Sequence, residues 1–313
     1  MPQQRGDFRV DHTEMEKQIL PSKLRLIFPR RTGEEPDPPQ ADFSDGWGGR
    51  VDALHADIKV PSEHWMNGRQ FAAEYQIYHL HRTRKMAPVV SVLVDIHPNN
   101  IMNPHLQRAL EKWQKVFDIN FLKCEYKKKK ERRTKAKHFK NTPNKMSVDL
   151  AEAHEIGSTI WGNELYGEEM DFRQLRREAQ GNWFQAGSIW NPYHKDLVRS
   201  IHFYGYSGSL TEPPCTQFVE WRVIDTPMLV SKMQLYQMKR LIFGHVNENC
   251  DMTSNHHDGS VARPLQDIRS RPVYQCTCRD FLSDDVRNIF DQKKCSQREY
   301  DLSISSEVGE RAR

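Results

Sequence analysis

Three neighbouring segments between residues 50 and 97 have the patterns of β-strands, and the first two alternate polar and apolar side chains with a period of two. The segments are RVDALHADIKV (50–60), FAAEYQIYHLH (71–81) and APVVSVLVDIH (87–97). The third is nearly continuous in β-branched residues, which is typical of a strand buried on both faces. Because the three strands follow one another so closely, we predict a largely antiparallel sheet.

The alternation also predicts which side chains share a face. One face of the first segment carries His55, Asp57 and Lys59 together with Val51 and Ala53. One face of the second segment carries Glu74, Gln76 and Tyr78. We therefore expect two polar faces on neighbouring strands, where a functional site could form.

The apolar period changes to that of a helix in two places. In PHLQRALEKWQKVFD (104–118) the repeating residues are Leu106, Leu110, Trp113 and Phe117. Residues 231–246 carry a second stripe, Leu235, Met238, Leu241 and Ile242, for which core packing is the favoured interpretation. Two further strands are expected at 200–210 and 218–230. The fold class is therefore α+β, mainly β, built as a single domain around one large twisted sheet.

Composition indicates long polar segments around this domain. The chain has 313 residues with 37% hydrophobic residues, and its mean hydropathy is −0.80, which is low for a compact globule. We interpret residues 1–43 as a polar, flexible lead-in, 44–275 as the folded domain with an enlarged basic or loop insertion at about 100–198, and 276–313 as a polar C-terminal extension.

The most basic part of the insertion is EYKKKKERRTKAKHFK (125–140). It lacks the interleaved aromatic residues that support nucleic-acid contact, so we interpret it as a solvated loop that could bind a protein partner. The net charge of +4 implies neither nucleic acid nor a membrane surface. No segment has the roughly 20 apolar residues that a membrane span needs, and we recognise no secretory signal, so localisation stays undetermined.

The segment YSGSLTEPPCTQFVEW (206–221) resembles the active-site loop of the α-class carbonic anhydrases. Three more segments resemble that family in the same order: PSEHWMNGRQFAAEYQIYH (61–79), IDTPMLVSKMQLYQMKRL (224–241) and VARPLQ (261–266). The resemblance implies a zinc ion held by three histidines, which lowers the pKa of bound water so that hydroxide attacks carbon dioxide. It also implies that carbon dioxide and bicarbonate are the substrates of an active member.

The resemblance assigns catalytic and pocket positions in this chain. Thr211 stands at the hydroxyl gatekeeper and Glu63 at its carboxylate partner. Leu210 and Trp221 match walls of the apolar substrate pocket. Tyr78 occupies a wall position where a small aliphatic residue is usual, which could narrow the cleft.

The metal positions depart from the family. The resemblance places the ligands at His55, Asp57 and Gln76, so only one of the three expected histidines is present. Asp57 would raise the pKa of a bound water, and the Gln76 amide is a poor donor to zinc. Glu74, which in the family accepts a hydrogen bond from the third histidine, is left without that imidazole. The set predicts weak or no metal binding.

The N-terminal part departs as well. The early Gln-Ser-Pro-Ile segment of the family has no counterpart in residues 1–50, so the resemblance implies that part of the fold is missing and that Cys215 lacks its usual partner cysteine. Two functions follow from the sequence. One is carbonic anhydrase activity with an unusual ligand set, and the alternative is a catalytically silent, carbonic-anhydrase-related binding module. A nucleic-acid-binding role ranks third.

Overall fold

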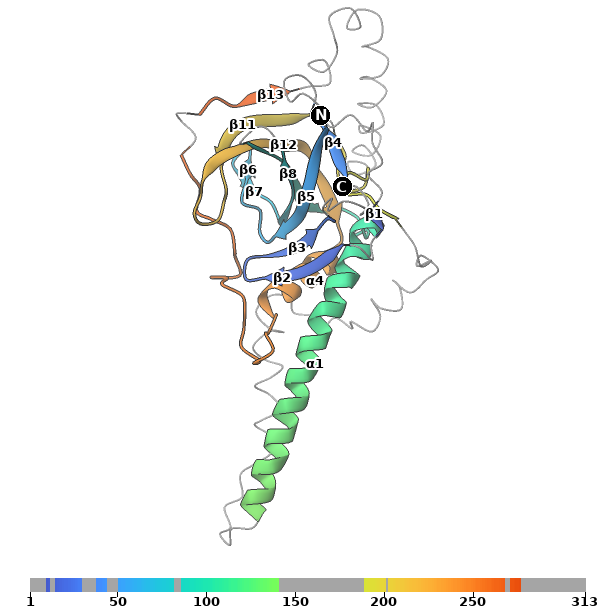
Figure 1. The fold of residues 1–313 in the computed structure, drawn as a ribbon, viewed down its shortest axis with the longest axis vertical. Coiled ribbons are helices and arrows are strands. Elements are labelled where there is room, and N and C mark those ends of the chain that lie inside the picture. The colour runs from blue at the N-terminus through green and yellow to red at the C-terminus, as the bar shows by residue number, and fades with distance from the viewer. Residues whose placement is uncertain are drawn as a thin grey trace, which may run out of the picture. The chain divides into compact units, whose positions relative to one another are not determined.

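The computed structural model describes residues 10–11, 15–29, 38–43, 50–81, 86–140, 189–200, 202–267 and 271–276. The chain forms two compact units, one of residues 1–122 with 189–313 and one of residues 123–188. Helix α1 (Pro104–Lys140) runs from the first unit into the second (Figure 1). The predictions for 141–188 and 277–313 lie outside the described residues.

The first unit is built around a sheet that has nine strands within the described residues. In chain order they are β2 (Glu16–Leu20), β3 (Lys23–Ile27), β4 (Gln40–Asp42), β5 (Arg50–Lys59), β8 (Ala73–Leu80), β9 (Ala87–Ile96), β11 (Phe203–Ser209), β12 (Gln217–Val230) and β13 (Tyr274–Cys276). The order across the sheet is β13-β11-β12-β9-β8-β5-β3-β2, and β4 pairs with β5. Only β9 and β12 pair in parallel among these strands. The predicted fold class is confirmed.

The prediction of a flexible lead-in over residues 1–43 is wrong for residues 16–28. Strands β2 and β3 pair with each other, and β3 extends the sheet by pairing with β5. Leu24, Leu26 and Phe28 are each at most 1% exposed. The sequence KLRLI alternates as a strand does, but the charged residues around it obscured that signal.

Strand β5 contains a β-bulge that the alternation did not predict. Ala53 pairs with His79 and His55 with Tyr78, which leaves Leu54 without a place in this register. Because the extra residue reverses the faces, Val51 and Ala53 join Ala56 and Ile58 in the main apolar core. The prediction that Val51 and Ala53 share a face with Asp57 is therefore wrong, whereas the placement of Asp57 and Lys59 holds.

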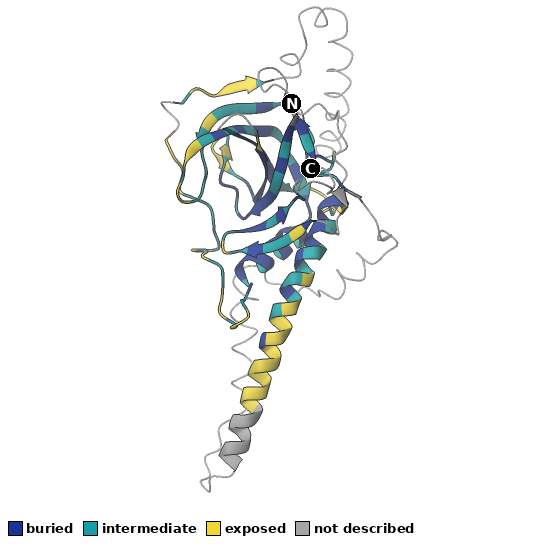
Figure 2. Ribbon diagram, in the orientation of Figure 1, coloured by how far each residue is buried: buried dark blue, intermediate teal, exposed yellow. Residues whose placement is uncertain are grey.

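Both predicted helical stripes are buried in the core. Trp113 of α1 is fully buried, and its indole N–H donates to the carbonyl oxygens of Gln18 and Arg25, at 3.1 and 3.2 Å. Helix α4 (Lys232–Phe243) begins with a capping box formed by Ser231 and Gln234 and ends at Gly244. The hydrogen bonds of Trp113 connect the first turns of α1 to β2 and β3, and those turns contain the buried part of the helix (Figure 2).

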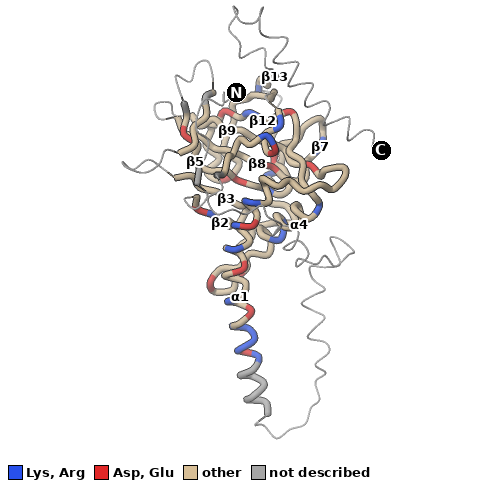
Figure 3. Tube along the Cα trace, turned by 90° about the vertical axis from the view of Figure 1, so that its right-hand side faces the viewer, with Lys and Arg blue, Asp and Glu red and all other residues tan. Residues whose placement is uncertain are grey.

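The basic run continues helix α1 rather than forming a loop. Residues 125–132 are helical and exposed (Figure 2), and their lysines gather along the helix in Figure 3. The prediction of a loop is wrong because Lys, Glu and Arg have high helix propensity, so charge alone does not end a helix. None of the described helices is long and apolar enough to cross a bilayer.

Four short strands complete the described elements: β1 (Val10–Asp11) pairs with β10 (Ile189–Trp190), and β6 (Trp65–Met66) pairs with β7 (Arg69–Gln70). Cys215 is a free thiol, in agreement with the expectation that it lacks its usual partner. Cys124 and Cys250 are each disulfide-bonded.

Candidate functional site

The site lies where β5 pairs with β8. The register places Asp57 opposite Gln76, Lys59 opposite Glu74 and His55 opposite Tyr78. Directly opposed residues on one face of a sheet are close enough for their side chains to interact. Strand pairing therefore brings the predicted metal positions together.

Asp57 is engaged by basic residues. It is fully buried, and its two carboxylate oxygens accept hydrogen bonds from Arg25 Nε and Nη2, each at 2.7 Å. Lys23 Nζ lies 3.5 Å from Asp57 Oδ2, and His55 Nε2 lies 3.6 Å from the same oxygen. Burial raises the pKa of Asp57, but the hydrogen bonds from Arg25 and the nearby positive charges outweigh it, so the pKa is lowered. Asp57 is thus an ionised partner of Arg25.

Lys59 lies between the two predicted catalytic residues. Its Nζ donates to Thr211 Oγ1 at 2.8 Å and lies 2.9 Å from Glu63 Oε2. Glu212 Oε1 is 3.3 Å from the same Nζ, and Glu212 also pairs with Lys23. Burial lowers the pKa of Lys59, but Glu63 and Glu212 outweigh it and the pKa is raised. The side chain is 1% exposed and remains an ammonium ion.

Gln76 is oriented by hydrogen bonds on both ends of its amide. Its Nε2 donates to Glu63 Oε2 at 3.1 Å and to Glu74 Oε1 at 2.7 Å, while its Oε1 accepts from the Tyr78 hydroxyl at 2.9 Å. The amide therefore presents N–H groups to the acidic residues of the site and uses its carbonyl oxygen elsewhere.

Glu74 has gained a different imidazole. The Nδ1 of His64 lies 2.7 Å from Glu74 Oε1, and because a carboxylate only accepts, Nδ1 is the donor. The Nε2 of His64 lies 2.6 Å from the Tyr206 hydroxyl, and Ser91 Oγ donates to Glu74 at 2.8 Å. Burial lowers the pKa of His64, but Glu74 outweighs it and the pKa is raised. Gln76 stands where the third family ligand would be, and the imidazole that pairs with Glu74 is that of His64, which the sequence did not assign to it.

The three predicted pocket walls pack against one another. Tyr78 and Trp221 are buried in one apolar cluster with Val89 and Val219, and Leu210 packs against it. Tyr78 also stacks on His55 with ring centroids 4.6 Å apart. The large ring of Tyr78 therefore occupies space beside the metal positions that a small aliphatic residue would leave open.

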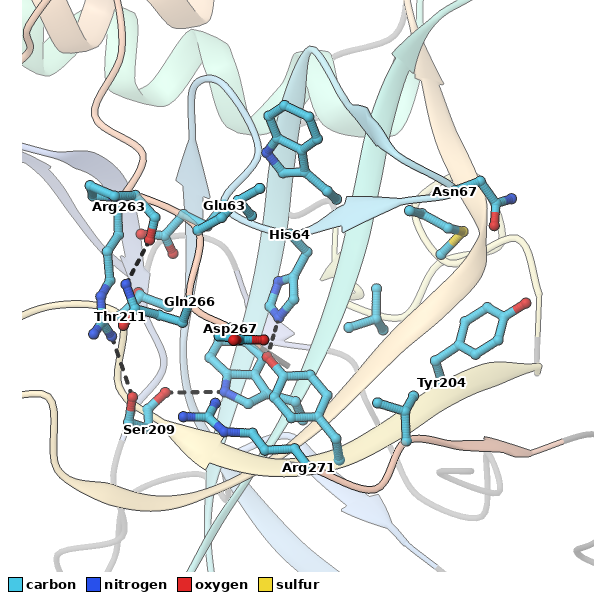
Figure 4. A pocket seen from close by; sticks show the side chains of 18 residues that line it. Glu63, His64, Asn67, Tyr204, Ser209, Thr211, Arg263, Gln266, Asp267 and Arg271 are labelled. Carbon is cyan, nitrogen blue, oxygen red and sulfur yellow. Dashed lines mark hydrogen bonds between the residues drawn. The ribbon is translucent and has the colours of Figure 1, made fainter. Parts of the chain in front are cut away.

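A cavity of about 450 Å³ adjoins this network. Figure 4 shows Glu63, His64, Thr211 and Arg263 around it, together with Ser209 on β11. The described residues that line it do not include His55, Asp57, Lys59 or Gln76. The cavity thus reaches the predicted catalytic pair but not the predicted metal positions.

The residues present do not fit a zinc ion. Zinc binds through lone pairs of neutral imidazole or of carboxylate oxygens. Both oxygens of Asp57, however, accept hydrogen bonds from the Arg25 guanidinium, which places a positive charge against them, and Gln76 directs N–H groups toward Glu63. Two lysine ammonium groups, Lys23 and Lys59, lie in the same network. Within the described ranges, no group of three His, Cys, Asp or Glu residues is arranged to hold a metal ion.

Four residues of this network were not assigned to the site from the sequence: Lys23, Arg25, Lys59 and Glu212. The alternation of β5 placed Lys59 on the correct face, and that was the available signal. Lys23 and Arg25 alternate with Leu24 and Leu26 in β3, which could have identified them as one polar face. The pairing of β3 with β5, which brings them to Asp57, has no local signal.

Comparison with known proteins agrees with the sequence motifs. A family model described as eukaryotic-type carbonic anhydrase matches residues 176–277. Alpha carbonic anhydrase 7 of Arabidopsis thaliana is 26% identical over 214 residues, covering 68% of this chain and 50% of that protein. Carbonic anhydrase 6 of Mus musculus is 41% identical over 75 residues, covering 24% of this chain and 23% of that protein. The chain thus spans about half the length of the Arabidopsis relative.

Among solved structures, the chain is similar to the α-carbonic anhydrase of Thermovibrio ammonificans, with 17% identity and a TM-score of 0.46, covering 85% of this chain and 76% of that one. The family model and the curated relatives support an assignment of this chain to the α-class carbonic anhydrase family. Relative to the motifs of that family the chain is divergent, because the resemblance aligns His55, Asp57 and Gln76 with the zinc-ligand positions.

Proposed function

We propose that this chain is a carbonic-anhydrase-related protein that does not hydrate carbon dioxide through a metal-bound hydroxide and instead acts as a binding module. One observation carries the proposal: Arg25 forms a two-pronged hydrogen bond with Asp57, at 2.7 Å for each contact. A metal ion bound to this carboxylate would have to lie against the guanidinium or displace it. Displacing the guanidinium would leave the largely buried Arg25 charge without its carboxylate partner, which is costly.

The exposed basic part of α1 supports a protein partner of acidic character. Lys127, Lys128, Lys129 and Lys130 are consecutive and exposed on that helix. An extended positive surface speeds association with a negatively charged partner and makes binding depend on salt. This part of the proposal is tested by measuring the affinity of the chain for a duplex DNA fragment and for a polyglutamate peptide of equal charge. We expect tighter binding of the peptide. Preference for DNA would replace the protein partner with a nucleic acid.

The activity proposal is tested by metal content and turnover. Protein purified without chelator is analysed for zinc by elemental analysis, and carbon dioxide hydration is followed by stopped-flow pH change. We expect far less than one equivalent of zinc and hydration at the buffer rate. Stoichiometric zinc that disappears in Asp57→Ala, together with hydration above the buffer rate, would refute the proposal and establish a working metal site.

A further inference from the structure

The ammonium group of Lys59 has the surroundings of a bound cation. An ammonium has three N–H donors, and three oxygen atoms lie around Nζ: Thr211 Oγ1 at 2.8 Å, Glu63 Oε2 at 2.9 Å and Glu212 Oε1 at 3.3 Å. Each comes from a different side chain. The coordination of Lys59 is therefore complete within the protein.

The charges of the network also balance. Three carboxylates, Asp57, Glu63 and Glu212, are paired with three basic side chains, Lys23, Arg25 and Lys59. Buried charges are tolerated when they are paired and hydrogen-bonded. A divalent cation would add two positive charges to a network that is already neutral, at close range to two ammonium groups and a guanidinium, where repulsion is strong.

We propose that Lys59 is the resident cation of this site, meaning the positive group that Thr211 and Glu63 hold, and that Lys59 and Arg25 together exclude metal ions from it. This proposal rests on the proposed absence of metal chemistry and adds its cause, namely the positive charges of Lys59 and Arg25. The loss of two histidines is then only part of the reason that no metal binds. Restoring the histidines leaves the excluding charges in place.

The geometry also explains why both basic residues matter. Replacing Asp57 by histidine removes the carboxylate that Arg25 pairs with, and the guanidinium then lies beside the new imidazole. Replacing Gln76 by histidine removes an N–H donor to Glu63, which leaves Glu63 Oε2 with Lys59. In the histidine-restored chain, Arg25 and Lys59 still face the three imidazoles.

The test compares zinc affinity among variants of the full chain, by competition with a chromophoric chelator. The variants are Asp57→His/Gln76→His, the same pair with Lys59→Met and Arg25→Met added, and the same pair with the control Lys232→Met, whose side chain is exposed on α4. We expect the quadruple variant to bind zinc at least about 100-fold more tightly than the histidine-restored pair. The control substitution should leave the zinc affinity of the histidine-restored pair unchanged.

Equal zinc affinity in the quadruple variant and the histidine-restored pair would overturn the proposal, while the proposed lack of activity in the natural chain could still stand. Circular dichroism checks that each variant is folded. A second measurement uses the natural chain: at neutral pH the ¹⁵N-labelled Nζ of Lys59 should give a slowly exchanging signal, absent in Lys59→Met and unchanged by added zinc. A Lys59 ammonium that exchanges like a surface lysine, or shifts with zinc, would also overturn it.

Discussion

The pair of Arg25 and Asp57 provides the sharpest test of how the network stabilises the fold. Asp57 is fully buried and Arg25 donates to both of its oxygens at 2.7 Å. Removing one member of a buried ion pair costs about 3–5 kcal/mol because the other charge stays buried. Lys23, 3.5 Å from Asp57, keeps part of the compensation. We therefore expect Arg25→Met to lower the free energy of unfolding by about 3 kcal/mol.

The chain contains a matched control for this measurement. Arg69 also contacts both oxygens of a carboxylate, those of Asp95 at 2.8 and 2.7 Å, but its side chain is 60% exposed. An exposed pair contributes about 0–1 kcal/mol. Equilibrium unfolding in urea at pH 7 gives both values. If Arg25→Met costs no more than Arg69→Met, burial does not set the strength of this pair and the reasoning fails.

Three further predictions concern titration and packing. Burial raises the pKa of Glu212, but Lys59, Lys23 and Ser22 outweigh it and lower the pKa to about 2. The stabilisation that ionised Glu212 gives the fold is therefore present above pH 4.5 and disappears as the pH falls toward about 2. The difference in unfolding free energy between the natural chain and Glu212→Gln should shrink across that window, and a pH-independent difference would contradict the ion pairs. Because the pKa of His64 is raised, the stabilisation that protonated His64 gives the fold is complete below pH 6.5 and disappears as the pH rises through the pKa of His64 in the folded protein. NMR titration should show a lower His64 pKa in Glu74→Gln than in the natural chain. An unchanged pKa would exclude the pairing of His64 with Glu74. Trp113→Ala should cost about 3–5 kcal/mol in urea unfolding, whereas Tyr126→Ala, at a side chain on the same helix that is 73% exposed, should cost much less; similar costs would show that α1 does not anchor the sheet.

Local sequence determined the elements of the first unit. The period of two in residues 71–81 correctly placed Glu74, Gln76 and Tyr78 on one face, because neighbouring side chains of a strand point to opposite sides of a sheet. The helical stripe in residues 104–118 was likewise correct. The long motif at 206–221 pointed to the α-class carbonic anhydrases, since such a combination of residues in one loop is rare by chance, and the family model matches the same part of the chain.

Long-range pairing decided the chemistry of the site. Asp57 could be recognised from the sequence as a substitute for a zinc ligand, but its partner Arg25 is 32 residues away on a strand that was interpreted as a lead-in. Glu212 is 189 residues from Lys23. Whether a buried carboxylate binds a metal or a guanidinium depends on which charge lies nearest in space, and only the tertiary structure supplies that distance.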